Sequence, residues 1–176
     1  MNQTTQPTLC ASLAFVNPAF PSIRTDDAGE VVLWHGGRPR ETVRAEILAI
    51  KDHLMTMDGE KLEMQVDHVF VDGMYMRRLH IPAGTLLVGK IHRKDCINAV
   101  ESGDISVMTE FGSRRVQAGF IGSSRAGICK LGYAHVDTIF VNVFRTAETS
   151  IEAVEREIAC ESFEDLGVVE SIGVTS

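Results

Sequence analysis

The chain has 176 residues and a mass of 19.3 kDa, a size that suits one domain with a sizeable core. With 44% hydrophobic and 23% charged residues, its composition excludes the collagen-like, disordered and membrane-embedded classes. The formal net charge of −7 is unevenly distributed, because residues 73–145 carry ten Lys or Arg against five Asp or Glu, whereas residues 1–72 and 146–176 are acidic. A basic centre can attract an anionic ligand, or the acidic arms can neutralise it by packing against it.

The polar stretch Met1–Pro7 lacks the basic and apolar regions of a signal peptide, and no run reaches the roughly 18 apolar residues of a membrane span. We therefore expect a cytoplasmic protein that binds no membrane. The cysteines lie far apart and form no C-x-x-C pair, which favours free thiols over a disulfide framework or a zinc finger. They are Cys10, Cys96, Cys129 and Cys160.

Prolines and glycine turns predict that residues 1–38 form an irregular arm with short strands at 13–16 and 30–34. Val31–Trp34 could pair with a sheet edge or with a neighbouring subunit. A helix is predicted over residues 39–57, because a proline suits the first helical position and apolar residues then recur at spacings of four, three and four. This apolar stripe consists of Val43, Ile47, Ile50 and Leu54.

Short apolar runs separated by turn signals every 8–12 residues extend over residues 66–146, with no helical pattern between them. This arrangement favours an antiparallel sandwich or barrel, and a jelly roll is compatible with the glycine spacing. Thr149–Glu152 then has the S/T-x-x-E form that opens a helix, predicted over 149–161. Residues 162–176 are predicted to be a loose or strand-exchanged tail, and the whole chain one domain.

Two glycine-spaced motifs lie in the central segment, with fifteen residues between them. The first runs Gly84, five residues, Lys90-Ile91-His92, three residues, Cys96, six residues, Gly103. The second runs Gly119, five residues, Arg125-Ala126-Gly127, two residues, Lys130, three residues, Ala134. Both resemble the motifs of the cupin superfamily. The resemblance implies a mainly β, cupin-like jelly-roll barrel with an N-terminal and a C-terminal flanking helix.

About half of the chain also resembles a group of small cupin-like proteins associated with bacteriophages and prophages. The segments that carry this resemblance are Met74–Arg78, Ile81–Thr85, Gly89–His92, Gly103–Val107 and Ala134–Thr138. It implies a viral origin, with the host cytoplasm as the location, but no settled activity.

The cupin resemblance places Lys90 and Lys130 where the family has two of its histidine ligands. A protonated amine donates no lone pair and repels a divalent cation, and a metal needs three or four ligands. His92 and Cys96 could supply two of them, and His80 or His135 could complete a site. We therefore expect no metal and no other cofactor.

Residues two apart on a strand share a face, so Lys90 and His92 are predicted to point into the barrel together. Two readings of a basic interior remain open. The lysines could form internal salt bridges, with Asp95 or Asp137 as partners, or reach out of the barrel mouth. Alternatively, the interior could be a socket for phosphate or carboxylate. The candidate ligand-binding residues of that socket are Lys90, His92, Lys130, Arg125 and Arg77, with Tyr75 and Tyr133 as stacking surfaces and the Gly122–Gly127 loop beside them.

The sequence contains no nucleophile, base and acid constellation that can be argued from spacing. The leading hypothesis is a non-catalytic, homodimeric protein that binds an anionic small molecule and sequesters a nucleotide-like host defence signal, without binding duplex nucleic acid. One alternative is a metal-dependent cupin enzyme, either an isomerase or an oxygenase. Another is a structural or protein-interaction module that acts through its acidic helices.

Overall fold

The computed structural model describes residues 6–7, 19–56 and 63–170. The strand predicted at 13–16 and the position of Cys10 lie outside these residues. Over the described part of the chain, no helix is both long enough and apolar enough to span a membrane.

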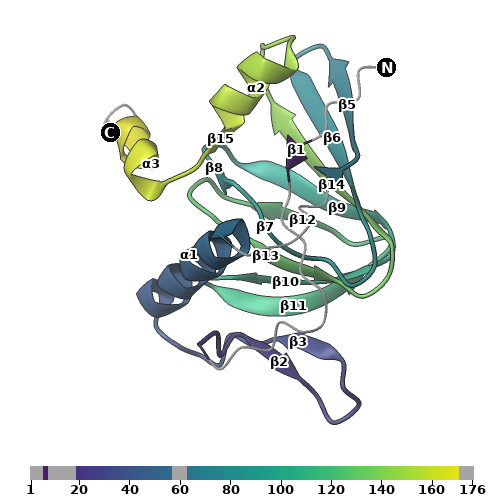
Figure 1. The fold of residues 1–176 in the computed structure, drawn as a ribbon. Coiled ribbons are helices and arrows are strands. Elements are labelled where there is room, and N and C mark those ends of the chain that lie inside the picture. Colours follow the sequence, from purple (N-terminus) through teal and green to yellow (C-terminus); the bar gives the residue numbers. More distant parts are fainter. Residues whose placement is uncertain (1–5, 8–18, 57–62, 171–176) are drawn as a thin grey trace.

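Two antiparallel sheets form the centre of the molecule (Figure 1). One has the strand order β12-β9-β14-β6-β5 and the other the order β11-β10-β13-β7. If the two-residue strand β8 is left aside, eight strands follow one another along the chain from β6 to β14. The first, third, sixth and eighth (β6, β9, β12 and β14) share one sheet, and the second, fourth, fifth and seventh (β7, β10, β11 and β13) share the other. This is the winding of a jelly roll, so the predicted fold class is confirmed. The strands are β5 Val66–Val71, β6 Met74–Ile81, β7 Leu86–Val88, β8 Ile91–His92, β9 Cys96–Ser102, β10 Asp104–Thr109, β11 Gly112–Gln117, β12 Ile121–Ser124, β13 Leu131–Ala134 and β14 Thr138–Arg145.

Strand alternation divides the space between the sheets into an apolar part, a polar row and a second apolar part. Ile81, Val100 and Ile105 belong to the buried cluster at one end. Tyr75 and Phe144 belong to the cluster at the other end, which α2 (Ile151–Ile158) covers through Val154 and Ile158. Between them, the strand register places Arg77 opposite Asn142 and Asn142 opposite Asn98. Polar side chains therefore cross the middle of the barrel.

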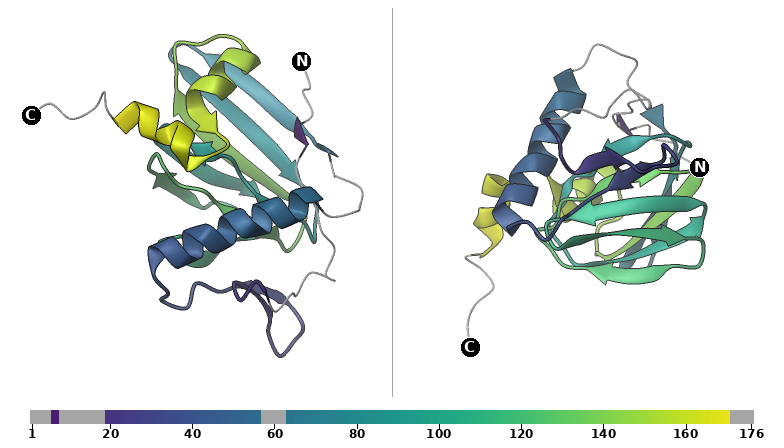
Figure 2. Two further views of the ribbon diagram at one scale, coloured as in Figure 1. Left: turned by 60° about the vertical axis from the view of Figure 1, so that its left-hand side comes forward. Right: turned by 90° about the horizontal axis from the view of Figure 1, so that it is seen from below.

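Helix α1 (Arg40–Thr56) and the hairpin of β2 (Ile23–Thr25) and β3 (Val31–Leu33) cover the outer face of the β11-β10-β13-β7 sheet (Figure 2). The apolar stripe predicted for the helix is buried there at all four positions, together with Ile23, Val31 and Leu33. β3 pairs with β2 of its own chain. The expectation that residues 31–34 add to the edge of a larger sheet is therefore wrong, whereas pairing with a neighbouring subunit stays a prediction.

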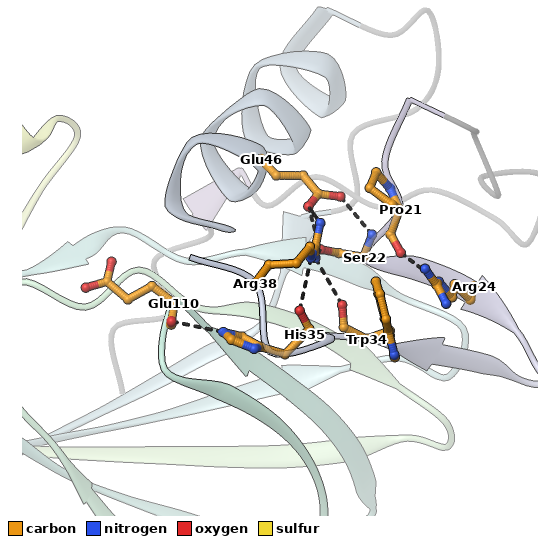
Figure 3. A network of polar contacts seen from close by, with 8 residues as sticks. All are labelled: Pro21, Ser22, Arg24, Trp34, His35, Arg38, Glu46 and Glu110. Atoms are coloured by element: carbon orange, nitrogen blue, oxygen red, sulfur yellow. Dashed lines mark hydrogen bonds and ion pairs between the residues drawn. The ribbon is translucent and has the colours of Figure 1, made fainter. Parts of the chain in front are cut away.

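A buried ion pair fastens the β2–β3 hairpin to α1 (Figure 3). The carboxylate of Glu46 accepts hydrogen bonds from the backbone N–H and the hydroxyl of Ser22, both at 2.7 Å, and from Arg38 Nη1 at 2.6 Å. Arg38 also donates to the carbonyls of Trp34 and His35, and the guanidinium of Arg24 lies 3.4 Å from the centre of the Trp34 ring. Both carboxylate oxygens of Glu46 and all three guanidinium nitrogens of Arg38 take part in hydrogen bonds, as the partial burial of the pair requires.

The C-terminal segment is more ordered than predicted. Ser150 caps α2 by accepting from the N–H of Ala153, and β15 (Ala159–Cys160) then pairs with β8. The prediction of a loose or strand-exchanged tail over 162–176 is wrong for α3 (Phe163–Glu170). The Ser162 hydroxyl accepts from the N–H of Asp165 and donates to its carboxylate, which satisfies a donor at the start of this helix. Two further short strands, β1 (Gln6–Pro7) and β4 (Glu63–Met64), pair with each other.

Candidate functional site

A cleft of about 1170 Å³ opens at the side of the barrel, where β11 and β12 are the edge strands of the two sheets. Its walls come from β11, from β12 and the Gly122–Gly127 loop, from the first turns of α1, and from α3 through Phe163 and Leu166. Lys130, which precedes β13, and Asn98 of β9 lie at its inner end. Segments far apart in the sequence therefore meet around one space, which is large enough for a small-molecule ligand.

The cleft is strongly cationic. Among the described residues that line it are five basic side chains and one acidic side chain. The acid, Glu110, is already bound by Arg44, whose Nε and Nη2 donate to its two carboxylate oxygens at 2.5 and 2.7 Å. This hydrogen bonding raises the pKa of Arg44. The other basic residues form no ion pair within the described part of the chain; they are Arg40, Arg114, Arg125 and Lys130.

Three of the cleft arginines are stacked on phenyl rings that also line the cleft. The guanidinium carbons lie 4.4 Å, 4.2 Å and 5.2 Å from the ring centres in the pairs Arg40–Phe111, Arg44–Phe163 and Arg114–Phe120 respectively. Stacking on a ring fixes the plane of a guanidinium while leaving its edge free to donate. The cleft thus offers oriented cations beside aromatic surfaces.

A chain of hydrogen bonds leads inward from the cleft through the polar row of the barrel. Asn98 Nδ2 donates to Ser124 Oγ at 3.1 Å, and Asn142 Nδ2 donates to Asn98 Oδ1 at 2.9 Å. Arg77 Nε donates to Asn142 Oδ1 at 3.2 Å. Arg77 therefore lies beyond the side-chain amides of Asn98 and Asn142, and it is not among the residues that line the cleft.

Lys130 is the innermost cation of the cleft and has no carboxylate partner among the described residues. Its Nζ lies 3.4 Å from His92 Nδ1. Burial lowers the pKa of Lys130, and the positive charge of Arg77 lowers it further. A buried ammonium without a counterion is unfavourable, so an anion that enters the cleft would stabilise its charged form.

His92 is buried beside Lys130, and its imidazole is neutral. Burial above all, and then the charges of Lys130 and Arg77, lower the pKa of His92 to about 2. Nδ1 lies 3.4 Å from both Lys130 Nζ and Cys96 Sγ. Because its pKa is so low, this histidine is a poor proton acceptor at neutral pH.

The donors around His92 do not fit a resident transition metal. The amine of Lys130 lies beside Nδ1, where a metal bound to this nitrogen would lie. Within the described chain, Cys96 is the only thiol or carboxylate residue in contact with Nδ1. The other candidate ligands lie elsewhere: His80 is 2.8 Å from a carboxylate oxygen of Asp67, and His135 is 2.8 Å from Ser106 Oγ. Two donors beside an amine fall short of the three or four that a protein metal site uses.

Of the candidate residues, Lys130, Arg125 and the Gly122–Gly127 segment come together in the cleft, and the prediction of a loop is wrong for Gly122–Ser124, which belong to β12. The prediction that Lys90 points inward beside His92 is wrong. Strand β8 begins only at Ile91, so the alternation does not extend to residue 90. Lys90 instead lies 3.3 Å from Glu161 and 4.0 Å from Glu155 on the side covered by the C-terminal segment.

The two tyrosines also lie away from the cleft. Tyr75 is fully buried with its hydroxyl 2.7 Å from His68 Nδ1, and burial raises its pKa to about 12. Tyr133 is buried in the cluster under α1, on the outer face of its sheet. The proposed salt-bridge partners of the lysines are not such partners either, because Asp95 and Asp137 accept from the backbone N–H groups of Ala126 and Ala83.

Sequence reasoning missed Arg40, Arg44 and Arg114, together with the phenylalanines under them. One signal was present: Arg40 and Arg44 are four residues apart on a predicted helix and must share a face. Nothing local in the sequence places that face beside β11 and the 122–127 loop.

No family model matches the chain, and no curated protein matches it. Solved structures with a similar fold include KdgF from a Halomonas species, with 18% identity, a TM-score of 0.43 and coverage of 51% of this chain and 87% of the other. A cupin-like protein from Thermotoga maritima has 12% identity, a TM-score of 0.42 and coverage of 48% and 69%. A cupin-2 domain containing protein from Shewanella frigidimarina has 10% identity, a TM-score of 0.40 and coverage of 55% and 92%. At these values the similarity carries no argument about activity.

Proposed function

We propose that the protein is a non-catalytic binding protein for an anionic small molecule that contains an aromatic ring, with a nucleotide as the best-fitting class. The observation that carries the proposal is the cleft, where four basic side chains without a carboxylate partner in the described chain surround phenyl-lined space. Guanidinium groups suit phosphate, and their stacking partners suit a planar ring.

The chemistry of the cleft favours binding over turnover. Its described lining contains no histidine and no cysteine, and its one carboxylate, Glu110, is neutralised by Arg44. Of the described lining residues, only Lys130, whose pKa burial lowers, is a candidate general base, and a bound anion would keep its amine protonated. The metal-dependent isomerase or oxygenase is the weaker alternative, because His92 and Cys96 lie next to Lys130 rather than next to further ligands.

The alternative of an interaction module rests on the acidic helices, and half of their six acidic side chains form ion pairs within the molecule. On α1, Glu46 is bound by Arg38. On α2, Glu155 and Glu157 lie beside Lys90 and Lys94. Glu41, Asp52 and Glu152 are the acidic groups of these helices that form no ion pair within the described chain, and three dispersed carboxylates are a weaker basis for recognition than the cationic cleft, so we prefer the small-molecule hypothesis.

In biological terms, we propose that this binding sequesters a nucleotide-like signal of a host defence response, as the resemblance to phage-associated cupin-like proteins suggests. A protein that holds its ligand without converting it acts as a sink, and its effect then depends on affinity and abundance alone. A homodimer is the expected assembly.

Isothermal titration with AMP, ADP, ATP and adenosine tests the proposal. We expect the three nucleotides to bind and adenosine to bind far more weakly, because charge-assisted hydrogen bonds to phosphate contribute roughly 1.5–3 kcal/mol each. Arg125→Gln removes a cation of the cleft and should weaken nucleotide binding about tenfold. Arg156→Gln removes an exposed cation of α2 and serves as the matched control. Equal affinity for adenosine and the nucleotides, or no binding of any, would refute the proposal.

A further inference from the structure

The cleft has cations at two separate places on the inner face of one sheet. Arg114 is on the edge strand β11 and has the same inward parity as Val116, which is buried between the sheets. Lys130 immediately precedes β13, whose Ala134 is buried between the sheets, and its Nζ lies 3.4 Å from Nδ1 of the buried His92. Both side chains line the cleft, so both cations face the same ligand space.

The register of the sheet sets the distance between the Cα atoms of these two residues. Arg114 pairs with Val107 of β10, and Val107 pairs with Gly132 of β13. Lys130 is two residues before Gly132 in the chain. Two inter-strand steps of about 4.8 Å and two residue steps of about 3.4 Å put the two Cα atoms about 12 Å apart. One phosphate group can contact both Lys130 and Arg114 only if both side chains extend toward each other.

The surface between the two cations is apolar. Val107 and Val116 lie on the same inner face, and Phe120 and Phe140 line the cleft from the opposite sheet and its connection. Phe120 also carries the guanidinium of Arg114 at 5.2 Å. The base of a nucleotide would pack on this apolar surface while its phosphate groups contact the cations on either side.

The two ends also differ in their chemistry. At the inner end, Lys130 is buried beside a neutral imidazole, and Asn98 and Ser124 supply further polar atoms. At the outer end, Arg114 is exposed and planar. A ligand with two separate anionic groups can place one group at each end of the cleft. A continuous chain of phosphates carries its charge in one place and fits this arrangement less well.

From this geometry we infer that the ligand is a nucleotide with phosphate groups at two separate positions of its sugar, one bound by Lys130 and the other by Arg114. A nucleoside 3′,5′-bisphosphate has this chemistry, whereas a nucleoside 5′-diphosphate carries its charge at one end. This inference rests on the proposed nucleotide-binding function and specifies its ligand class.

Titration of the parent protein with adenosine 3′,5′-bisphosphate, ADP and AMP tests the inference with ligands of closely similar size. We expect the bisphosphate to bind at least about tenfold more tightly than ADP, the factor that corresponds to one extra charge-assisted contact. Lys130→Met and Arg114→Gln should each reduce that preference to about twofold or less, and Arg156→Gln should keep it. The comparison of the two ligands on the parent protein does not depend on the folding of any variant.

The outcomes separate this inference from the proposed function. Binding of ADP and the bisphosphate with equal affinity would overturn the two-site arrangement and leave nucleotide binding standing. Failure of all three ligands to bind would overturn both. A preference for the bisphosphate that survives both substitutions, measured on variants whose circular dichroism matches the parent, would also overturn the assignment to Lys130 and Arg114.

Discussion

Replacement of His92 by asparagine should change the acid stability of the protein in a defined pH window. The asparagine side chain keeps a polar atom near the position of Nδ1 but does not titrate. In the parent, burial lowers the pKa of His92 from its ordinary value of 6.5 to about 2. Below pH 6.5 the unfolded chain therefore binds a proton that the folded protein does not bind, and the free energy of unfolding falls as the pH falls.

The expected magnitude follows from the linkage between pKa and stability. One pKa unit corresponds to about 1.4 kcal/mol, so His92 should lower the free energy of unfolding by roughly 2–3 kcal/mol between neutral pH and about pH 4.5. This loss continues down to about pH 2, where the folded protein also becomes protonated. Carboxylates add their own dependence, so the informative quantity is the difference between parent and variant.

Urea unfolding of both proteins at about pH 7, 5.5 and 4.5 measures this difference. His92→Asn is expected to lose some stability at neutral pH, because the imidazole packs edge-on against Phe144, but to lose less on acidification than the parent does. Asn98→Ala, in the adjacent hydrogen-bond chain, is the control that lowers stability without removing a titrating group. The reasoning fails if parent and His92→Asn lose stability in parallel over this acidic range.

The remaining predictions concern the other buried charges and the assembly. Lys130→Met should leave the thermal midpoint unchanged or raise it, because burial lowers the pKa of an amine that has no carboxylate partner in the described chain; a loss of roughly 3–5 kcal/mol, typical of a broken buried ion pair, would contradict this. Glu46→Ala should cost roughly 3–5 kcal/mol in urea unfolding by leaving Arg38 and Ser22 without their acceptor, whereas Glu41→Ala at an exposed position of α1 should cost far less. Light scattering should show a homodimer at micromolar concentration, with a monomer as the contradicting result, and deletion of residues 1–38 should destabilise the fold, since it removes apolar residues of the core under α1. Elemental analysis should find no stoichiometric iron, zinc, manganese or nickel; about one ion per chain that His92→Ala removes would contradict the donor geometry.

The fold was largely predictable because its signals are local. Turns at short intervals indicated an antiparallel β protein, and the stripe from Val43 to Leu54 located α1 within one residue at each end. α3 was missed although Ser162-Phe163-Glu164-Asp165 has the form of a helix start, because the apolar pattern after it is weak. The pairing of β3 with β2 could not be told from pairing with another subunit, since both satisfy the same backbone groups.

The site was predictable only in part, because its residues come together through the tertiary fold. The motif spacing led to Lys130 and to the loop that contains Arg125, and both line the cleft. Lys90 was misplaced because the two-residue alternation holds only within a strand, and β8 begins after it. Arg40 and Arg114 are far apart in the sequence and belong to different elements, so no spacing rule could join them.

Hydrogen exchange of the parent protein with and without saturating ADP tests the central claim most directly, because it locates the ligand without any substitution. The account predicts slower exchange in residues 122–127 and in β11 (Gly112–Gln117), which border the cleft, and no change in β5 (Val66–Val71) on the far edge of the other sheet. Protection confined to segments outside the cleft, or no protection at all, would contradict it.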